Sequence, residues 1–257
     1  MRELISRKEL NIVYFKFDQN LGKHIAWRKG LELFKGRYVI TADDDDPVLP
    51  HALEVHHNHW LTLEQQPNYN DFWEVRTRCQ TPDGKMVGAP LPLPFYDSDY
   101  IDVNIIAKNK AEMVASRRLD ILKKYANVPP FPYEESCTNL LEGVRWIRAA
   151  RYFKTRFVPD ITRVYIPNAN GLCVNKSRSL RASFNALVGY SLMISENRDL
   201  LLRYSRKEFF TSAAIIARML DVTGVSLRPF DMKLRDKLLI HTLRPLTKLL
   251  SIFKIIK

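Results

Sequence analysis

The sequence predicts an α/β fold in the N-terminal two-thirds of the chain and a helical, basic extension after it. A β-branched run at residues 38–42 ends in four aspartates, residues 43–46. An amphipathic helical pattern at residues 25–34 precedes that run, and an apolar run at residues 12–15 precedes the helix. Strand, helix, strand is the unit of a parallel sheet. Residues 166–257 hold 16 Lys/Arg against 6 Asp/Glu, a net +10 of the chain's +12, and their pattern is helical.

Turn and capping residues set the order of the remaining elements. Gly36 follows the first helix in the manner of a C-cap, and Pro82-Asp83-Gly84-Lys85 is typical of a hairpin turn. Residues 89–102 contain three prolines and several acids and aromatics, which favours a loop lining a cleft. The predicted helices cover residues 50–63, 118–125, 142–151, 179–190, 198–204 and 207–220, and the further predicted strands cover residues 71–80 and 157–166.

The four aspartates at the end of the predicted strand 38–42 indicate a cation site. Adjacent carboxylates repel one another, so the end of a buried strand gains nothing from them unless a cation binds. Mg²⁺ and Mn²⁺ prefer carboxylate oxygen, and Mg²⁺ is usually shared between one or two carboxylates and substrate phosphates. The alternative is a solvated acidic turn that caps the next helix. A histidine metal site is a weaker alternative, because His57 and His59 point to different sides of their helix.

Composition excludes several classes of protein. With 257 residues and 46% apolar residues, the chain can bury a sizeable core and is not disordered. Cys79, Cys137 and Cys173 are odd in number and widely spaced, which supports neither a disulfide framework nor a cysteine zinc site and predicts a reducing compartment. The N-terminal residues lack the apolar core of a signal peptide, and no run is as long as a membrane-spanning helix. We expect a soluble or peripheral protein.

Acidic side chains downstream provide candidates for acid–base chemistry. Glu142 stands at the start of the predicted helix 142–151, and Glu134 and Glu135 lie on the loop before it. A carboxylate at a helix start gains about 0.3 to 1 kcal/mol from the helix dipole, which is a purely structural explanation. A carboxylate at a helix start that faces a cleft is also suited to accept a proton.

The C-terminal tail, from Met232 onward, has a basic amphipathic pattern. Its structural interpretation is a helix docked on the domain with a solvated basic face, and its functional alternative is adsorption to a membrane. The apolar positions are Leu238, Leu239, Leu243, Leu246, Leu249, Leu250, Phe253 and Ile256, and the basic ones are Lys237, Arg244, Lys248, Lys254 and Lys257.

Several segments together resemble family-2 glycosyltransferases, over about residues 10 to 190. The most specific part is the spacing between the loop 20–23, Asn-Leu-Gly-Lys, and the run 43–46, which resembles the family's Asp-x-Asp-Asp motif. Downstream, several segments resemble the acceptor side of bacterial members. The remaining matching segments are Ala26, Gly30, Gly36-Arg37-Tyr38, Pro50-His51-Ala52-Leu53, Leu141 to Trp146, Arg151 to Thr155, Arg163-Val164-Tyr165 and Asn170-Gly171-Leu172.

The resemblance implies a GT-A fold, a mixed α/β sheet that transfers a sugar from a nucleotide-sugar donor with the help of Mn²⁺ or Mg²⁺. It places Asp43 near the donor ribose and the metal, Asp45 on the metal and Asp46 beside the sugar. Glu142 is similar in position to the residue that serves as general base. Lys23, Glu134 and Glu135 are further candidates for substrate binding. The implied acceptor is a surface glycan or a lipid-linked oligosaccharide, as in polysaccharide biosynthesis of the cell envelope.

Two departures from the family pattern stand out. Arg28 occupies the position, two residues before Gly30, where the family usually has Asn. Neither an opening strand followed by Pro-Thr-Tyr-Asn nor a second strand ending in Asp-Asp is present, although these segments hold the base and ribose in family members. The resemblance therefore implies an N-terminally truncated GT-A domain in residues 1–165 and a helical basic extension in residues 166–257, and we expect such a chain to be weakly active or inactive.

The functional prediction is an inverting, metal-assisted glycosyltransferase in the cytoplasm. Peripheral contact with the inner face of the membrane through the C-terminal tail stays the alternative to a docked helix. The alternative is a non-catalytic module whose basic C-terminal third binds nucleic acid or an acidic partner. This third contains no recognisable helix-turn-helix, zinc-finger or RNA-recognition motif, so no nucleic acid is expected.

Overall fold

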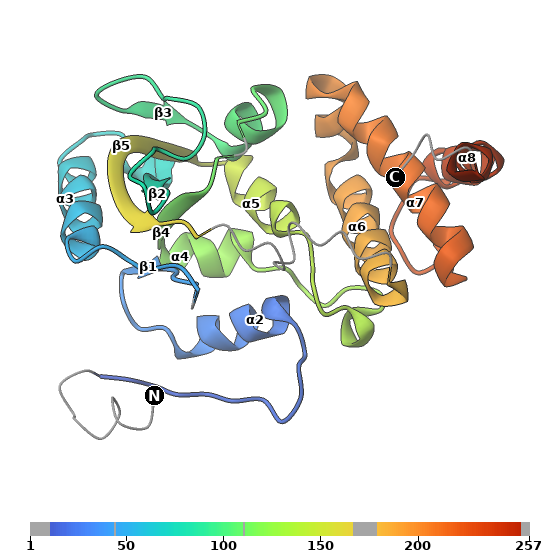
Figure 1. The fold of residues 1–257 in the computed structure, drawn as a ribbon, viewed down its shortest axis with the longest axis horizontal. Coiled ribbons are helices and arrows are strands. Elements are labelled where there is room, and N and C mark those ends of the chain that lie inside the picture. Colours follow the sequence, from blue (N-terminus) through green and yellow to red (C-terminus); the bar gives the residue numbers. More distant parts are fainter. Residues whose placement is uncertain (1–10, 44, 110, 167–178, 253–257) are drawn as a thin grey trace.

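The chain forms a five-stranded mixed sheet with helices on both faces, followed by three long helices (Figure 1). A computed structural model describes residues 11–43, 45–109, 111–166 and 179–252. Its strands are β1 (Tyr38–Ile40), β2 (Phe72–Gln80), β3 (Tyr96–Ser98), β4 (Met113–Arg118) and β5 (Lys154–Val164). Its α-helices are α2 (Lys23–Leu33), α3 (Ala52–Glu64), α4 (Leu119–Ile121), α5 (Glu142–Ala150), α6 (Leu180–Tyr204), α7 (Arg206–Thr223) and α8 (Leu234–Ile252), and its shorter helical turns are η1 (Tyr69–Asp71), η2 (Ile101–Ile106), η3 (Leu122–Ala126) and η4 (Glu134–Ser136).

The sheet order is β1-β4-β2-β5-β3, and only β2 and β5 run parallel. The predicted parallel strand-helix-strand unit at the N-terminus is therefore wrong. Residues 12–15 are not a strand, and Val13, Tyr14 and Phe15 are 65%, 57% and 48% exposed. β1 pairs antiparallel with β4, which lies between β1 and β2. Because β4 is short and leads directly into α4, its residues carry no separate strand signal.

The two faces of the sheet have different partners. On one face α3 packs Trp60 and Leu63 against Phe72, Val75 and Val158 of the central strands. On the other face α5 brings Trp146 against Trp73 in a second apolar cluster. The predicted hairpin after β2 is confirmed, because Thr81 N donates to Lys85 O over 2.8 Å.

The C-terminal helices form their own apolar core, which reaches the sheet through α5. The predicted break between residues 190 and 198 is wrong, because α6 is continuous from Leu180 to Tyr204. Gly189 lies inside α6, where a Cβ would come 2.7 Å from Leu141 Cγ. In Figure 1, α6 and α7 lie side by side and α8 packs on α7. Within the described residues, no helix is long and apolar enough to cross a membrane.

Candidate active site

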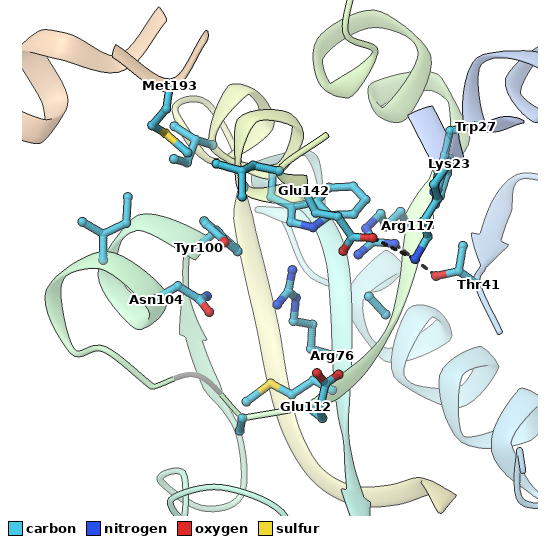
Figure 2. A pocket seen from close by; sticks show the side chains of 18 of the residues that line it. Lys23, Trp27, Thr41, Arg76, Tyr100, Asn104, Glu112, Arg117, Glu142 and Met193 are labelled. Carbon is cyan, nitrogen blue, oxygen red and sulfur yellow. Dashed lines mark hydrogen bonds and ion pairs between the residues drawn. The ribbon is translucent and has the colours of Figure 1, made fainter. Parts of the chain in front are cut away.

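A cavity of about 1010 Å³ opens on the sheet face that carries α5 (Figure 2). Residues from β2, β4, β5 and the turn after β1 line one side of it, and residues from α2, α5, η2, α6 and α7 line the others. Tyr100, from the segment predicted to line a cleft, is part of this lining. The walls combine basic, acidic and aromatic side chains, which suits a polar ligand with a flat ring or sugar.

One lysine joins the two acidic segments singled out by the sequence. Lys23 Nζ, at the first residue of α2, lies 2.8 Å from Glu142 Oε1 and 3.3 Å from Asp43 Oδ1. Figure 2 shows Lys23 and Glu142 reaching toward each other across the cavity mouth. Partial burial lowers the pKa of Lys23, but the hydrogen bond and charge of Glu142, together with Asp43, outweigh it and raise the pKa. The structure thus brings the predicted base, Glu142, and the first aspartate of the motif to one site.

A glycine sets the position of this lysine. Gly22, the residue before α2, has φ +89°, a conformation that residues with a Cβ rarely adopt. A Cβ at Gly22 would lie 2.6 Å from the carbonyl oxygen of Thr138, on the segment that leads into α5. The Gly-Lys pair therefore allows α2 to approach the start of α5 closely enough for Lys23 to reach Glu142.

A buried arginine neutralises the acidic turn from the other side. Arg163 Nη1 lies 3.3 Å from Asp43 Oδ2 and 3.5 Å from Asp46 Oδ2, and its Nη2 lies 3.3 Å from Glu112 Oε2. Asp46 is largely buried and also accepts a hydrogen bond from Ile166 N over 2.9 Å. Asp45 is exposed and does not line the cavity, and Asp44 lies outside the described residues.

The acidic turn can contribute to a metal site but does not complete one by itself. Among residues 11–43, 45–109, 111–166 and 179–252, no three His, Cys, Asp or Glu side chains are grouped to hold an ion. Asp43 is half exposed and lines the cavity, so its carboxylate can bind an ion that substrate phosphates also bind. One carboxylate fits a divalent ion that completes its coordination with substrate phosphates, provided that Asp43 leaves its ion pairs with Lys23 and Arg163.

Beneath these residues lies a charge network centred on a fully buried carboxylate. Glu74 on β2 has no exposed side-chain surface, and its carboxylate accepts from Arg117 Nε over 2.7 Å, Arg76 Nε over 2.8 Å and Thr155 Oγ1 over 2.9 Å. Burial raises the pKa of Glu74, but the charges of Arg76 and Arg117 outweigh burial and hold the pKa below its usual value. The guanidinium of Arg117 also stacks 3.9 Å from the ring of Trp146. Because two arginines, Arg76 and Arg117, pair with one carboxylate, this side of the cavity has a net positive charge.

Glu134 and Glu135, the other acidic candidates, do not line the cavity. Glu134 forms a two-point ion pair with Arg28, at 2.6 Å and 3.0 Å, and Arg28 also donates to Val128 O over 3.1 Å. Arg28, which stands where the family usually has Asn, thus joins α2 to the loop before α5 through this ion pair. Glu135 is exposed. Their assignment to substrate binding stays a prediction.

Arg76, Arg117 and Arg163 line the cavity but were missed from the sequence. A signal was available for Arg76, because Glu74, Arg76 and Arg78 occupy every second position of the strand and alternate with the uncharged Val75 and Thr77. Charged residues at every second position of a buried strand indicate one polar face. Arg117 had no such signal, since it lies on the strand that the sequence pattern did not predict.

Comparison with known proteins gives one family. No curated protein matches the chain. Four residues that line the cavity, Lys23, Thr41, Ala42 and Asp43, lie in the first part of the chain. This part, residues 1–69, matches the family model of Glycosyl transferase family 2.

Proposed function

We propose that this chain is a glycosyltransferase that moves a sugar from a nucleotide-diphosphate sugar to an acceptor hydroxyl with inversion at the anomeric carbon. The observation that carries the proposal is the joint position of Glu142 and Asp43 at one cavity, where both contact Lys23. Lys23 and Asp43 lie within the segment that matches the family model. A base for the acceptor and cations for the leaving group are the two requirements of such a transfer, and the cavity has candidates for both.

In the proposed reaction Glu142 accepts the proton of the acceptor hydroxyl as its oxygen bonds to the anomeric carbon. The bond between that carbon and the diphosphate oxygen breaks, and the electron pair leaves with the nucleoside diphosphate. Lys23, Arg76, Arg117 and Arg163 line the cavity and offer positive charge to the departing diphosphate. Transfer of the Lys23 contact from Glu142 to a phosphate would free the carboxylate to act as a base.

Asp43 is the residue that would hold Mg²⁺ or Mn²⁺, with the exposed Asp45 as the second candidate. A bound divalent ion supplies charge neutralisation on the diphosphate. The acceptor class, a surface glycan or a lipid-linked oligosaccharide, rests on the resemblance of the Glu142 segment to bacterial family members.

The test is turnover of a panel of nucleotide-sugars by the full chain with Mn²⁺ or Mg²⁺, read as release of nucleoside diphosphate. We expect Glu142→Gln to lower the rate by about 10² to 10⁴ while donor affinity stays nearly unchanged. Glu208→Gln is the matched control, because Glu208 also lines the cavity but from α7. Equal activity of Glu142→Gln and the parent would contradict the role of Glu142. Absence of turnover together with salt-sensitive retention of DNA would favour the non-catalytic binding module.

A further inference from the structure

Helix α8 lies at the end of the molecule away from the sheet (Figure 1) and exposes several apolar side chains. Its inner face packs on the C-terminal core through Ile240, which is fully buried, and through Leu239 and Leu243. Its outer face carries four leucines, although solvent-facing helix positions are normally polar. Leu234, Leu238, Leu246 and Leu249 are 72%, 58%, 51% and 52% exposed. We call these four residues the leucine stripe.

A row of basic residues runs beside the leucine stripe. Lys237, His241, Arg244 and Lys248 recur at three- or four-residue spacing, which places them along one flank of α8. The apolar stripe and the basic row are therefore neighbours on one helix surface. A basic row flanking an apolar stripe is the arrangement of helices that lie in the plane of a membrane interface.

A small basic pocket adjoins this row. It has a volume of about 360 Å³ and lies between the end of α7, the turn after it and α8. Among the described residues that line it, none is acidic. Four carry basic side chains: Arg228, Lys237, His241 and Arg244. Asp221 pairs with Arg244 over 2.8 Å from outside the lining, and Lys237 donates to Arg228 O over 3.3 Å. We call this the basic pocket, and its size and charge suit a phosphate group.

We propose that α8 docks on an anionic lipid surface, with the leucine stripe inserted among the acyl chains and a headgroup phosphate in the basic pocket. Charge favours this occupant over a second copy of the chain. Two copies meeting stripe to stripe would bring their basic rows together and would repel, whereas anionic lipids neutralise the row. The net +10 of residues 166–257 adds long-range attraction between this part of the chain and an anionic membrane. This inference does not depend on the proposed glycosyl transfer.

The experiment is flotation of the full chain with two kinds of vesicle: pure phosphatidylcholine, and phosphatidylcholine in which about a third of the lipid is phosphatidylglycerol. We expect binding to the anionic vesicles alone, with release as NaCl rises from about 0.1 to 0.5 M. Leu238→Gln with Leu249→Gln should weaken binding by about tenfold or more, because insertion of apolar side chains is lost. Arg228→Gln with Lys237→Gln should weaken it by about fivefold or more and should flatten the salt dependence.

Matched controls lie on the other side of the molecule. Leu53 and Leu61 are exposed leucines of α3, so Leu53→Gln with Leu61→Gln should leave flotation unchanged. Lys35→Gln with Lys85→Gln removes two exposed charges outside α8 and should change binding by less than about twofold. Flotation that is equal for the stripe variant and the parent, or equal on neutral and anionic vesicles, would overturn the proposal. A dimer in sedimentation that dissociates in the stripe variant, without vesicle binding by the parent, would overturn it in favour of self-association.

Discussion

Lys23 Nζ lies 2.8 Å from Glu142 Oε1, and the same nitrogen lies 3.3 Å from Asp43 Oδ1. One ammonium group thus connects the start of α5 with the acidic turn after β1. These carboxylates are about half exposed, so the contribution of such pairs to stability is at most about 1 kcal/mol. The arrangement matters more for where a negatively charged ligand can bind than for holding the fold together.

We expect Lys23→Met to weaken binding of a nucleoside diphosphate by about tenfold or more, because a charge-assisted contact to phosphate is lost. The melting temperature should change little. Titration by calorimetry with a nucleoside diphosphate and Mn²⁺ measures the first quantity, and thermal unfolding the second. Lys29→Met is the control on the same helix, since Lys29 pairs with Glu32 and does not line the cavity. Unchanged affinity in Lys23→Met would remove Lys23 from the proposed donor site.

Gly22→Ala should displace Lys23 and lower both stability and diphosphate affinity. The substitution forces a Cβ to 2.6 Å from Thr138 O at φ +89°. Gly84→Ala is a matched control, because Gly84 has φ +83° and a Cβ added there would have nothing within 4 Å, so only the backbone strain of about 1 kcal/mol remains. Chemical denaturation should therefore show a larger loss for Gly22→Ala. Equal losses would mean that the contact with Thr138 relaxes without cost.

The acidic turn gives a prediction about metal binding. Asp43→Asn with Asp45→Asn should abolish the rise in melting temperature that Mn²⁺ and a nucleoside diphosphate produce together. Without metal the variant should be nearly as stable as the parent, since Asp43 is half exposed and its ion pairs are weak. Asp83→Asn with Asp120→Asn removes two exposed carboxylates elsewhere and should keep the metal effect. Retention of the full metal effect in the double variant would place the ion elsewhere.

The sequence predicted the elements with strong local signals. α3, β2, α5 and β5 appear close to their predicted ranges, because apolar periodicity and turn residues mark them. The order of strands was not predictable in the same way. β4 lies between β1 and β2 although it comes later in the chain, and such pairing depends on contacts distant in sequence. The apolar run 12–15 lacks a partner strand in the described part of the chain and stays exposed, so its composition alone was misleading.

The candidate site shows the same division. The loop 20–23, the aspartates and Glu142 could be found from the sequence because each stands at the end of an element. The buried cationic partner of the aspartates could not, because Arg163 reaches Asp43 across 120 positions of sequence. Electrostatic repulsion among the aspartates is also weaker than the sequence suggests, because Lys23 and Arg163 form ion pairs with Asp43 and Asp46 within the protein.

A buried histidine on the opposite face of the sheet gives the last prediction. His56 on α3 is almost fully buried, and burial is the main reason that its pKa falls to about 4, with His59 and Arg117 lowering it further and Asp160 opposing them. Its hydrogen bonds fit the neutral ring. Trp60 Nε1 donates to Ser116 Oγ over 2.8 Å, which leaves the Ser116 hydroxyl to donate to His56 Nδ1 over 2.8 Å. A proton on Nδ1 would deprive the Ser116 hydroxyl of this acceptor.

Stability should therefore fall as pH drops from about 6.5, where the unfolded histidine begins to bind a proton, to about 4, where the folded one does. The unfolded state binds more protons in this window, so the free energy of unfolding rises with pH, by about 3 kcal/mol in total from this residue. The pKa of His24 is also lowered, chiefly by burial, and acts in the same direction. Urea unfolding across this range should show a shallower slope for His56→Gln than for the parent. A parent whose stability is flat from pH 6.5 to 4 would show that His56 is protonated without cost in the folded protein.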